Sequence, residues 1–169
     1  MLLTQSKAAP AAIAFAMTLA AVLGACSPSG GGKASGGGGG GLPSTPLDNQ
    51  IAAAIGDPTT CVLIADAATS KVLYRYGDDF NCARGLPACD SPALINAKTA
   101  LHFASKPGGR FASCNSLPDG SRQVGWAEGP VQSVAGRNLV YSAVMEGQRA
   151  LPGHEMNARL FDAFSKAGL

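Results

Sequence analysis

Two β-rich runs decide the fold of this chain: CVLIA at residues 61–65 and KVLYRY at residues 71–76. The first run is almost entirely apolar, whereas the second alternates, with Val72, Tyr74 and Tyr76 on one side. Successive side chains of a strand point to opposite faces, so a strand buried on both faces is apolar throughout. We therefore predict a hairpin whose first strand is the more buried.

Helices are predicted at both ends of the domain. In residues 47–55, apolar side chains recur every four positions until the sequence GDP at 56–58 ends the pattern. Residues 154–167 have the spacing of an amphipathic helix. Its apolar face is expected to contain Met156, Leu160, Ala163 and Phe164.

A central helix is predicted to start at Ser91, because serine is a good N-cap and Pro92 suits the first helical position. Its apolar face would contain Leu94, Ala97 and Leu101. Residues 123–128 and 138–145 are expected to be two more strands, and residues 77–90 and 110–122 to be loops. The prediction is an α+β domain, with an antiparallel sheet of about four strands covered by N-terminal, central and C-terminal helices.

The N-terminal part is expected to be processed. Residues 1–25 contain Lys7 and then an apolar run, as a signal peptide does. The sequence LGAC at residues 23–26 resembles the lipobox of bacterial lipoproteins, which implies acylation of Cys26 and attachment to a membrane. Ser27 at the next position implies the periplasmic face of the outer membrane. Residues 26–46 are glycine-rich and predict a flexible tether, which leaves residues 47–169 as a single periplasmic domain.

The charge of that domain excludes some partners. Lys7 and Lys33 precede residue 47 and all eleven Asp and Glu follow it, so residues 47–169 carry eleven positive and eleven negative side chains. A formally neutral domain is not typical of a nucleic-acid-binding protein. It also lacks a polybasic tract for an anionic membrane, so we expect membrane attachment through the lipid.

Four cysteines remain after Cys26, an even number in a compartment that permits disulfides. No two of them have the spacing of a zinc-binding C-x₂₋₄-C pair, so we predict two disulfides and neither a metal site nor a cofactor. The four residues are Cys61, Cys82, Cys89 and Cys114. Their sequence positions leave all three pairings open.

Several of these segments together resemble the penicillin-recognising serine enzymes, especially class D beta-lactamases. Residues 61–73 resemble their first hairpin, and LPACDS at 86–91 is similar to the region that carries their nucleophile. VGWAEG at 124–129, the strand after it and the terminal helix are similar to the end of that fold. The resemblance implies that Cys89 pairs with Cys114 and Cys61 with Cys82, with a bond between Cys82 and Cys89 as the alternative.

The catalytic motifs of that family are absent or altered here. Its Ser-x-x-Lys motif would need a lysine where Leu94 follows Ser91, and its Lys-Thr-Gly motif corresponds to DGS at 119–121, which lacks the cation. The chain is also too short for the family's helical insertion. The resemblance therefore implies a trimmed, catalytically inactive relative.

Other candidate residues are weaker. His154 and Glu155 resemble the start of a His-Glu-x-x-His site, but Ala158 occupies the second ligand position. His102 is expected to be a packed or surface residue, and Trp126 either a core residue or part of a binding surface.

The sequence predicts a membrane-anchored lipoprotein whose non-catalytic domain binds an envelope protein or peptidoglycan. The alternative is a serine hydrolase acting on peptidoglycan or beta-lactams through Ser91 or Ser121. A small-ligand carrier with the same order of elements is a third possibility.

Overall fold

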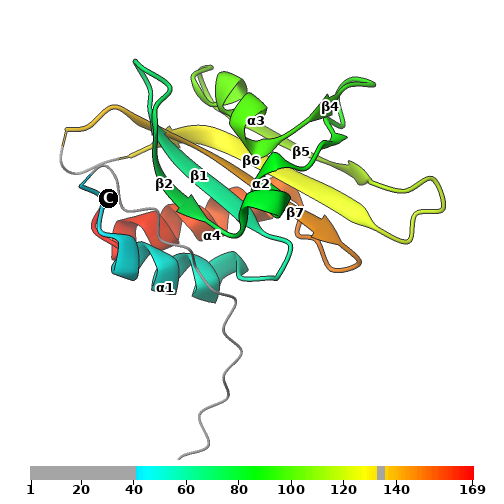
Figure 1. Cartoon of the computed structure of the whole chain (residues 1–169), viewed down its shortest axis with the longest axis horizontal. Coiled ribbons are helices and arrows are strands. Elements are labelled where there is room, and N and C mark those ends of the chain that lie inside the picture. The colour runs from blue at the N-terminus through cyan, green and yellow to red at the C-terminus, as the bar shows by residue number, and fades with distance from the viewer. Residues whose placement is uncertain (1–40, 133–135) are drawn as a thin grey trace, which may run out of the picture. The chain divides into compact units, whose positions relative to one another are not determined.

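The computed structural model describes residues 41–132 and 136–169. These residues form the predicted α+β domain, around an antiparallel sheet with five strands where about four were expected, in the order β2-β1-β7-β6-β5 (Figure 1). The predictions for residues 1–25 and for Cys26 lie outside the described residues. The strands are β1 (Cys61–Asp66), β2 (Val72–Tyr76), β5 (Arg110–Asn115), β6 (Gln123–Val131) and β7 (Leu139–Gly147).

Two helices cover one face of the sheet, α1 (Ser44–Ile55) and α4 (Gly153–Lys166) (Figure 1). Both bury the predicted apolar faces, and α1 begins at Ser44 rather than at residue 47. The core beneath them includes Val62 and Ile64 from β1 and Ala127 from β6. The predicted hairpin of β1 and β2 is present, and β1 is the more buried strand.

The opposite face is covered by shorter elements: α2 (Asp79–Ala83), the small strands β3 (Leu86–Pro87) and β4 (Leu94–Ile95), and α3 (Ala97–Ala104) (Figure 1). Side chains of β1 with odd numbers, including Cys61 and Leu63, point to this face. Trp126 of β6 lies in the same cluster and is fully buried.

The prediction for the start of the central helix is wrong. The helix begins at Ala97, and the side chain of Asn96 rather than Ser91 caps it by accepting a hydrogen bond from the Thr99 amide at 2.9 Å. Leu94, expected on the buried face of the helix, pairs with Pro87 in a strand and is exposed. Backbone pairing between β3 and β4 thus outweighs the local helix-start signal of Ser91 and Pro92.

Strand β5 is a fifth strand where a loop was expected. It lies at the edge of the sheet, and its residues alternate between exposed and half-buried. Several of its side chains are small or polar, including Ala112, Ser113 and Asn115, so they give little of the hydrophobic signal that predicts a strand. In the described part of the chain, no helix has the length and apolar character needed to span a bilayer.

The structure contains two disulfides, Cys61–Cys82 and Cys89–Cys114. Their Cα atoms are 5.2 Å and 5.4 Å apart, within the ordinary range for a disulfide. The pairing is the one that the family resemblance implied. Both bonds tie the segment between β2 and α3 to the sheet.

Candidate functional site

The candidate site is an exposed hairpin that several contacts hold against the sheet. We call residues 86–95 the pinned hairpin: β3, β4 and the turn between them. Leu86 pairs with Ile95, and the Ala88 amide donates to the Ala93 carbonyl at 3.0 Å. Residues 90–94 are exposed, so the hairpin presents its turn and Leu94 of β4 to solvent.

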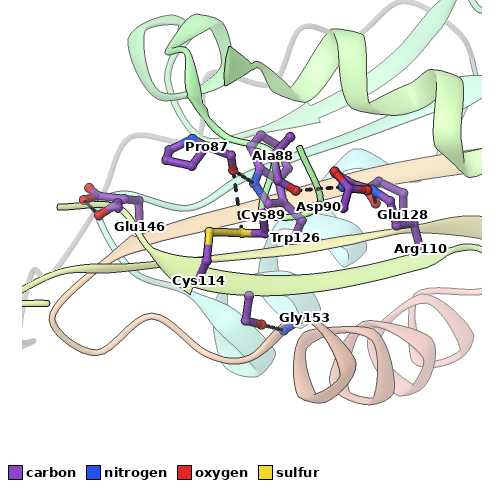
Figure 2. Close-up of a disulfide and its surroundings, with 12 residues drawn as sticks. Pro87, Ala88, Cys89, Asp90, Arg110, Cys114, Trp126, Glu128, Glu146 and Gly153 are labelled. Carbon is purple, nitrogen blue, oxygen red and sulfur yellow. Dashed lines mark hydrogen bonds and ion pairs between the residues drawn. A yellow bond between two sulfur atoms is a disulfide. The ribbon is translucent and has the colours of Figure 1, made fainter. Parts of the chain in front are cut away.

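Four contacts from the sheet fix the β3 arm of the pinned hairpin (Figure 2). The first is the Cys89–Cys114 disulfide, and the second is a 2.7 Å hydrogen bond from Trp126 Nε1 to the Pro87 carbonyl. Arg110 makes the other two, because its Nη1 atom donates to the Ala88 carbonyl at 2.8 Å and to Asp90 Oδ2 at 2.9 Å. These four contacts hold backbone carbonyl groups, one side chain and one sulfur atom of the arm, so they restrict its movement relative to the sheet.

Arg110 is itself held in place by a buried acid. Its Nε and Nη2 atoms donate to the two carboxylate oxygens of Glu128, each at 3.0 Å, and its guanidinium lies over the Phe103 ring at 4.4 Å. Glu128 is fully buried, and burial raises its pKa to about 7 although the hydrogen bonds from Arg110 oppose this rise. Arg110 therefore connects the sheet, α3 and the pinned hairpin.

A second buried glutamate ties α2 to the turn between β5 and β6. Glu146 accepts hydrogen bonds from Arg122 Nε at 2.7 Å and from Ser116 Oγ at 2.7 Å, and it lies 3.0 Å from Arg84 Nη1. The hydrogen bonds from Arg122 outweigh the effect of burial and lower the pKa of Glu146 to about 2. Glu146 is thus ionised at neutral pH and holds two arginines of different elements together.

Large apolar side chains are exposed on the elements that these contacts fix. Leu94 of the pinned hairpin is 69% exposed, Phe80 of α2 is 72% exposed and Leu117 of the β5–β6 turn is 41% exposed. Scattered exposed apolar residues are common on proteins. These three lie on short or irregular elements that disulfides and buried ion pairs hold in place.

The structure does not bring the two candidate serines together. Ser91 is exposed in the turn of the pinned hairpin, next to Asp90, which pairs with Arg110 at the start of β5. Ser121 follows the far end of that strand, which is about 17 Å long. Its Oγ donates to Asp119 Oδ1 at 2.7 Å, and the bonds from the backbone and side chain of Ser121 lower the pKa of Asp119. A carboxylate with a lowered pKa is a weak general base.

The structure also locates the other candidate residues, one tryptophan and two histidines. Trp126 is a core residue that anchors the pinned hairpin, and it is not part of a surface. His102 lies on the exposed side of α3, and His154 lies in the first turn of α4. Among residues 41–132 and 136–169, no three His, Cys, Asp or Glu residues are arranged to hold a metal ion.

Sequence reasoning missed Arg110, Glu128 and Glu146, although a signal for the glutamates was present. In a strand, residues two apart share a face, so Glu128 follows Val124 and Trp126 onto the buried face of β6. A buried carboxylate requires a partner that donates hydrogen bonds to it. The pattern could therefore have indicated a buried ion pair, but it does not identify the arginine.

Comparison of the chain with protein-family models, with curated proteins and with solved structures found no match.

Proposed function

We propose that the protein is a lipoprotein anchored through Cys26 to the periplasmic face of the outer membrane, and that its domain binds another envelope protein without catalysing a reaction. The LGAC sequence supports the anchor. The two disulfides support an oxidising compartment. The observation that carries the binding function is the exposure of Leu94 on a hairpin fixed at four points.

A fixed apolar side chain favours binding for an energetic reason. Association orders the side chains and loops of an interface, which costs about 0.5–1.5 kcal/mol for each flexible side chain that becomes immobile. The pinned hairpin is already ordered before a partner arrives, so this cost is small. Arg84 and Arg122, which pair with Glu146, are partly exposed, and arginine and aromatic residues are enriched at protein interfaces. This composition favours a protein partner over a glycan.

Site-specific photocrosslinking in the native envelope tests the proposal. A photoreactive residue at position 94 of the full chain is expected to give a discrete crosslinked product with one protein. The matched control places the same residue at Ala158, which is exposed on α4 on the opposite side of the sheet, and should give no such product. Adding Cys89→Ser and Cys114→Ser should weaken the product from position 94, because the hairpin loses one of its anchors.

Three outcomes would contradict the proposal. Equal products from positions 94 and 158 would show that contacts are non-specific, and recovery of peptidoglycan fragments alone would identify the cell wall as the ligand. Labelling by a fluorescent penicillin that disappears in Ser91→Ala would establish the serine hydrolase instead. The lipid anchor is tested separately by mass spectrometry, which should find a mature chain that begins with an acylated Cys26.

A further inference from the structure

A pocket of about 320 Å³ lies between α3 and the turn that joins β1 to β2, and the proposed partner binding does not use it. Two of its lining residues, Lys98 and His102, are one helical turn apart on α3. Side chains four residues apart on a helix lie on the same side of it, so both can reach one ligand. Ser70 contributes a hydroxyl from the β1–β2 turn, and Thr99 and Leu101 complete the lining.

Ser70 has an unusual backbone conformation for its residue type. Its φ angle is +56°, in the left-handed region that glycine adopts without strain and serine does not. A glycine would satisfy the same turn at lower conformational cost. The serine that is present instead of a glycine lines the pocket with its side chain. The turn therefore carries a hydroxyl group at a position where the backbone conformation favours glycine.

The positive charge of the pocket has little compensation. No ion pair in the described part of the chain involves Lys98 or His102. Residues 91–118, which include all of α3, contain neither Asp nor Glu.

Asp66 lies at the start of the β1–β2 turn, and its carboxylate accepts hydrogen bonds from other residues of that turn. Its Oδ1 atom accepts hydrogen bonds from the amides of Ala68 and Thr69 at 3.1 Å and 2.8 Å and from Thr69 Oγ1 at 2.8 Å. The bonds from Thr69 lower the pKa of Asp66. Asp66 remains charged, but among the described residues it forms no ion pair with Lys98 or His102.

We propose that this pocket binds a phosphate group. Its lining supplies an ammonium group, an imidazole and a hydroxyl, and each of them can donate a hydrogen bond to a phosphate oxygen. Lysine is a common phosphate ligand, and donation to a charged acceptor strengthens each bond. The phosphate could come from two sources, the headgroup of an anionic lipid in the membrane that holds the protein, or free phosphate in the surrounding solution.

The test uses the full chain in lipid nanodiscs and follows the NMR signals of Ser70, Lys98 and His102. One arm titrates inorganic phosphate in zwitterionic nanodiscs, and the other replaces part of the lipid by anionic phosphatidylglycerol without added phosphate. We expect saturable shifts in at least one arm, and the arm that responds identifies the source. Lys98→Gln and His102→Gln should each weaken the response about tenfold.

The matched control is Lys166→Gln, which removes a lysine that pairs with Asp162 on the opposite face and should leave the response unchanged. Both pocket residues are exposed, so neither substitution should impair folding, and the unchanged signals of the sheet would verify this. The proposal is overturned if neither arm responds, if chloride at the same ionic strength gives the same shifts, or if Lys98→Gln responds like the unaltered chain. Crosslinking at position 94 should be unaffected by Lys98→Gln, which separates this proposal from that of partner binding.

Discussion

The two faces of the sheet are stabilised in different ways. Beneath α1 and α4, apolar and tyrosine side chains form the core, whereas Glu128 and Glu146, the buried charged residues of the described chain, lie on the other face. The opposite face contains both disulfides and the buried residues Glu128, Ser142 and Glu146. Helix length accounts for the difference, because α1 and α4 have 12 and 14 residues whereas α3 has eight.

Short elements bury little apolar surface, so they need other contacts to stay in place. Residues 77–96 cover much of the α3 face with a five-residue helix and two strands of two residues. Two covalent bonds and two buried ion-pair clusters compensate for this small apolar contribution. We infer that the disulfides and ion pairs of the α3 face keep an irregular, exposed segment rigid. The following substitutions test this inference.

The largest expected effect is that of Arg110→Ala. It leaves Glu128 buried without its partner, and removing one member of a buried ion pair costs about 3–5 kcal/mol. The free energy of unfolding, measured by urea denaturation at pH 8, should fall by about this amount. At pH 5 the loss should be smaller, because Glu128 can then be buried in its neutral form.

Leu160→Ala provides the matched comparison on the other face. Leu160 is a fully buried residue of α4 that faces the sheet, and truncating a buried leucine typically costs about 2–5 kcal/mol. Because the substitution removes an apolar side chain and no charge, the loss should be equal at pH 5 and pH 8. If the loss for Arg110→Ala shows the same independence of pH, the account of the Arg110–Glu128 pair is wrong.

Removing the Cys89–Cys114 bond with the double variant Cys89→Ser/Cys114→Ser should cost about 3 kcal/mol. The bond closes a loop across a sequence separation of 25, and a cross-link of that length restricts the unfolded chain by about this amount. Amide hydrogen exchange should also become faster in residues 86–95 while the α1–α4 side stays protected. Uniformly faster exchange across the domain would contradict the separate roles assigned to the two faces.

The two buried glutamates should each change the free energy of unfolding in a different range of pH. Glu128 has a pKa of about 7 when folded and an ordinary value of 4.5, so the folded chain keeps a proton that the unfolded chain loses between these values. Stability from this group is complete below pH 4.5 and falls by up to about 3 kcal/mol as the pH rises to 7. Glu128→Gln should remove that fall in denaturation experiments across this range.

Glu146 serves as the control because its pKa shifts in the other direction. It falls from 4.5 to about 2, so the stabilisation from Glu146 is complete above pH 4.5 and is lost as the pH falls to 2. Glu146→Gln should lower the free energy of unfolding by a constant amount at higher pH. It should change the pH dependence of this free energy only between pH 2 and 4.5. An unchanged slope between pH 4.5 and 7 in Glu128→Gln would show that Glu128 is not the group that titrates there.

The smallest expected effect is that of Leu94→Ser. Leu94 is 69% exposed and contributes little to the core, so the free energy of unfolding should change by less than about 0.5 kcal/mol. The same substitution should reduce binding of the envelope partner identified by crosslinking. A large loss of stability would place Leu94 in the fold rather than in a binding surface.

Sequence patterns predicted the regular face of the sheet and missed the irregular one. The steps of four in α1 and α4 and the β-rich runs of β1 and β7 reflect burial against long elements, which leaves a periodic signal. The α3 face depends on contacts between residues far apart in the chain, such as Arg110 with Asp90 and Trp126 with Pro87. Local periodicity contains no information about such contacts, so Ser91 and Pro92 were interpreted as a helix start.

The candidate site was therefore only partly predictable. The cysteines that fix the pinned hairpin were identified as disulfides, and the resemblance to serine enzymes implied their pairing. Exposure of Leu94 could not be predicted, because its neighbours in sequence suggested a helical face. The anchor at Cys26 stays a prediction.

Backbone NMR order parameters of residues 89–94 test the central claim most directly. We expect this segment to be as rigid as the sheet, because Cys89, Asp90 and the neighbouring carbonyl groups are fixed by Cys114, Arg110 and Trp126. Its order parameters should be about 0.85, equal to those of β6 and β7. Values below about 0.6 in the unaltered, oxidised protein would show a flexible loop and contradict the proposal of a preorganised binding hairpin.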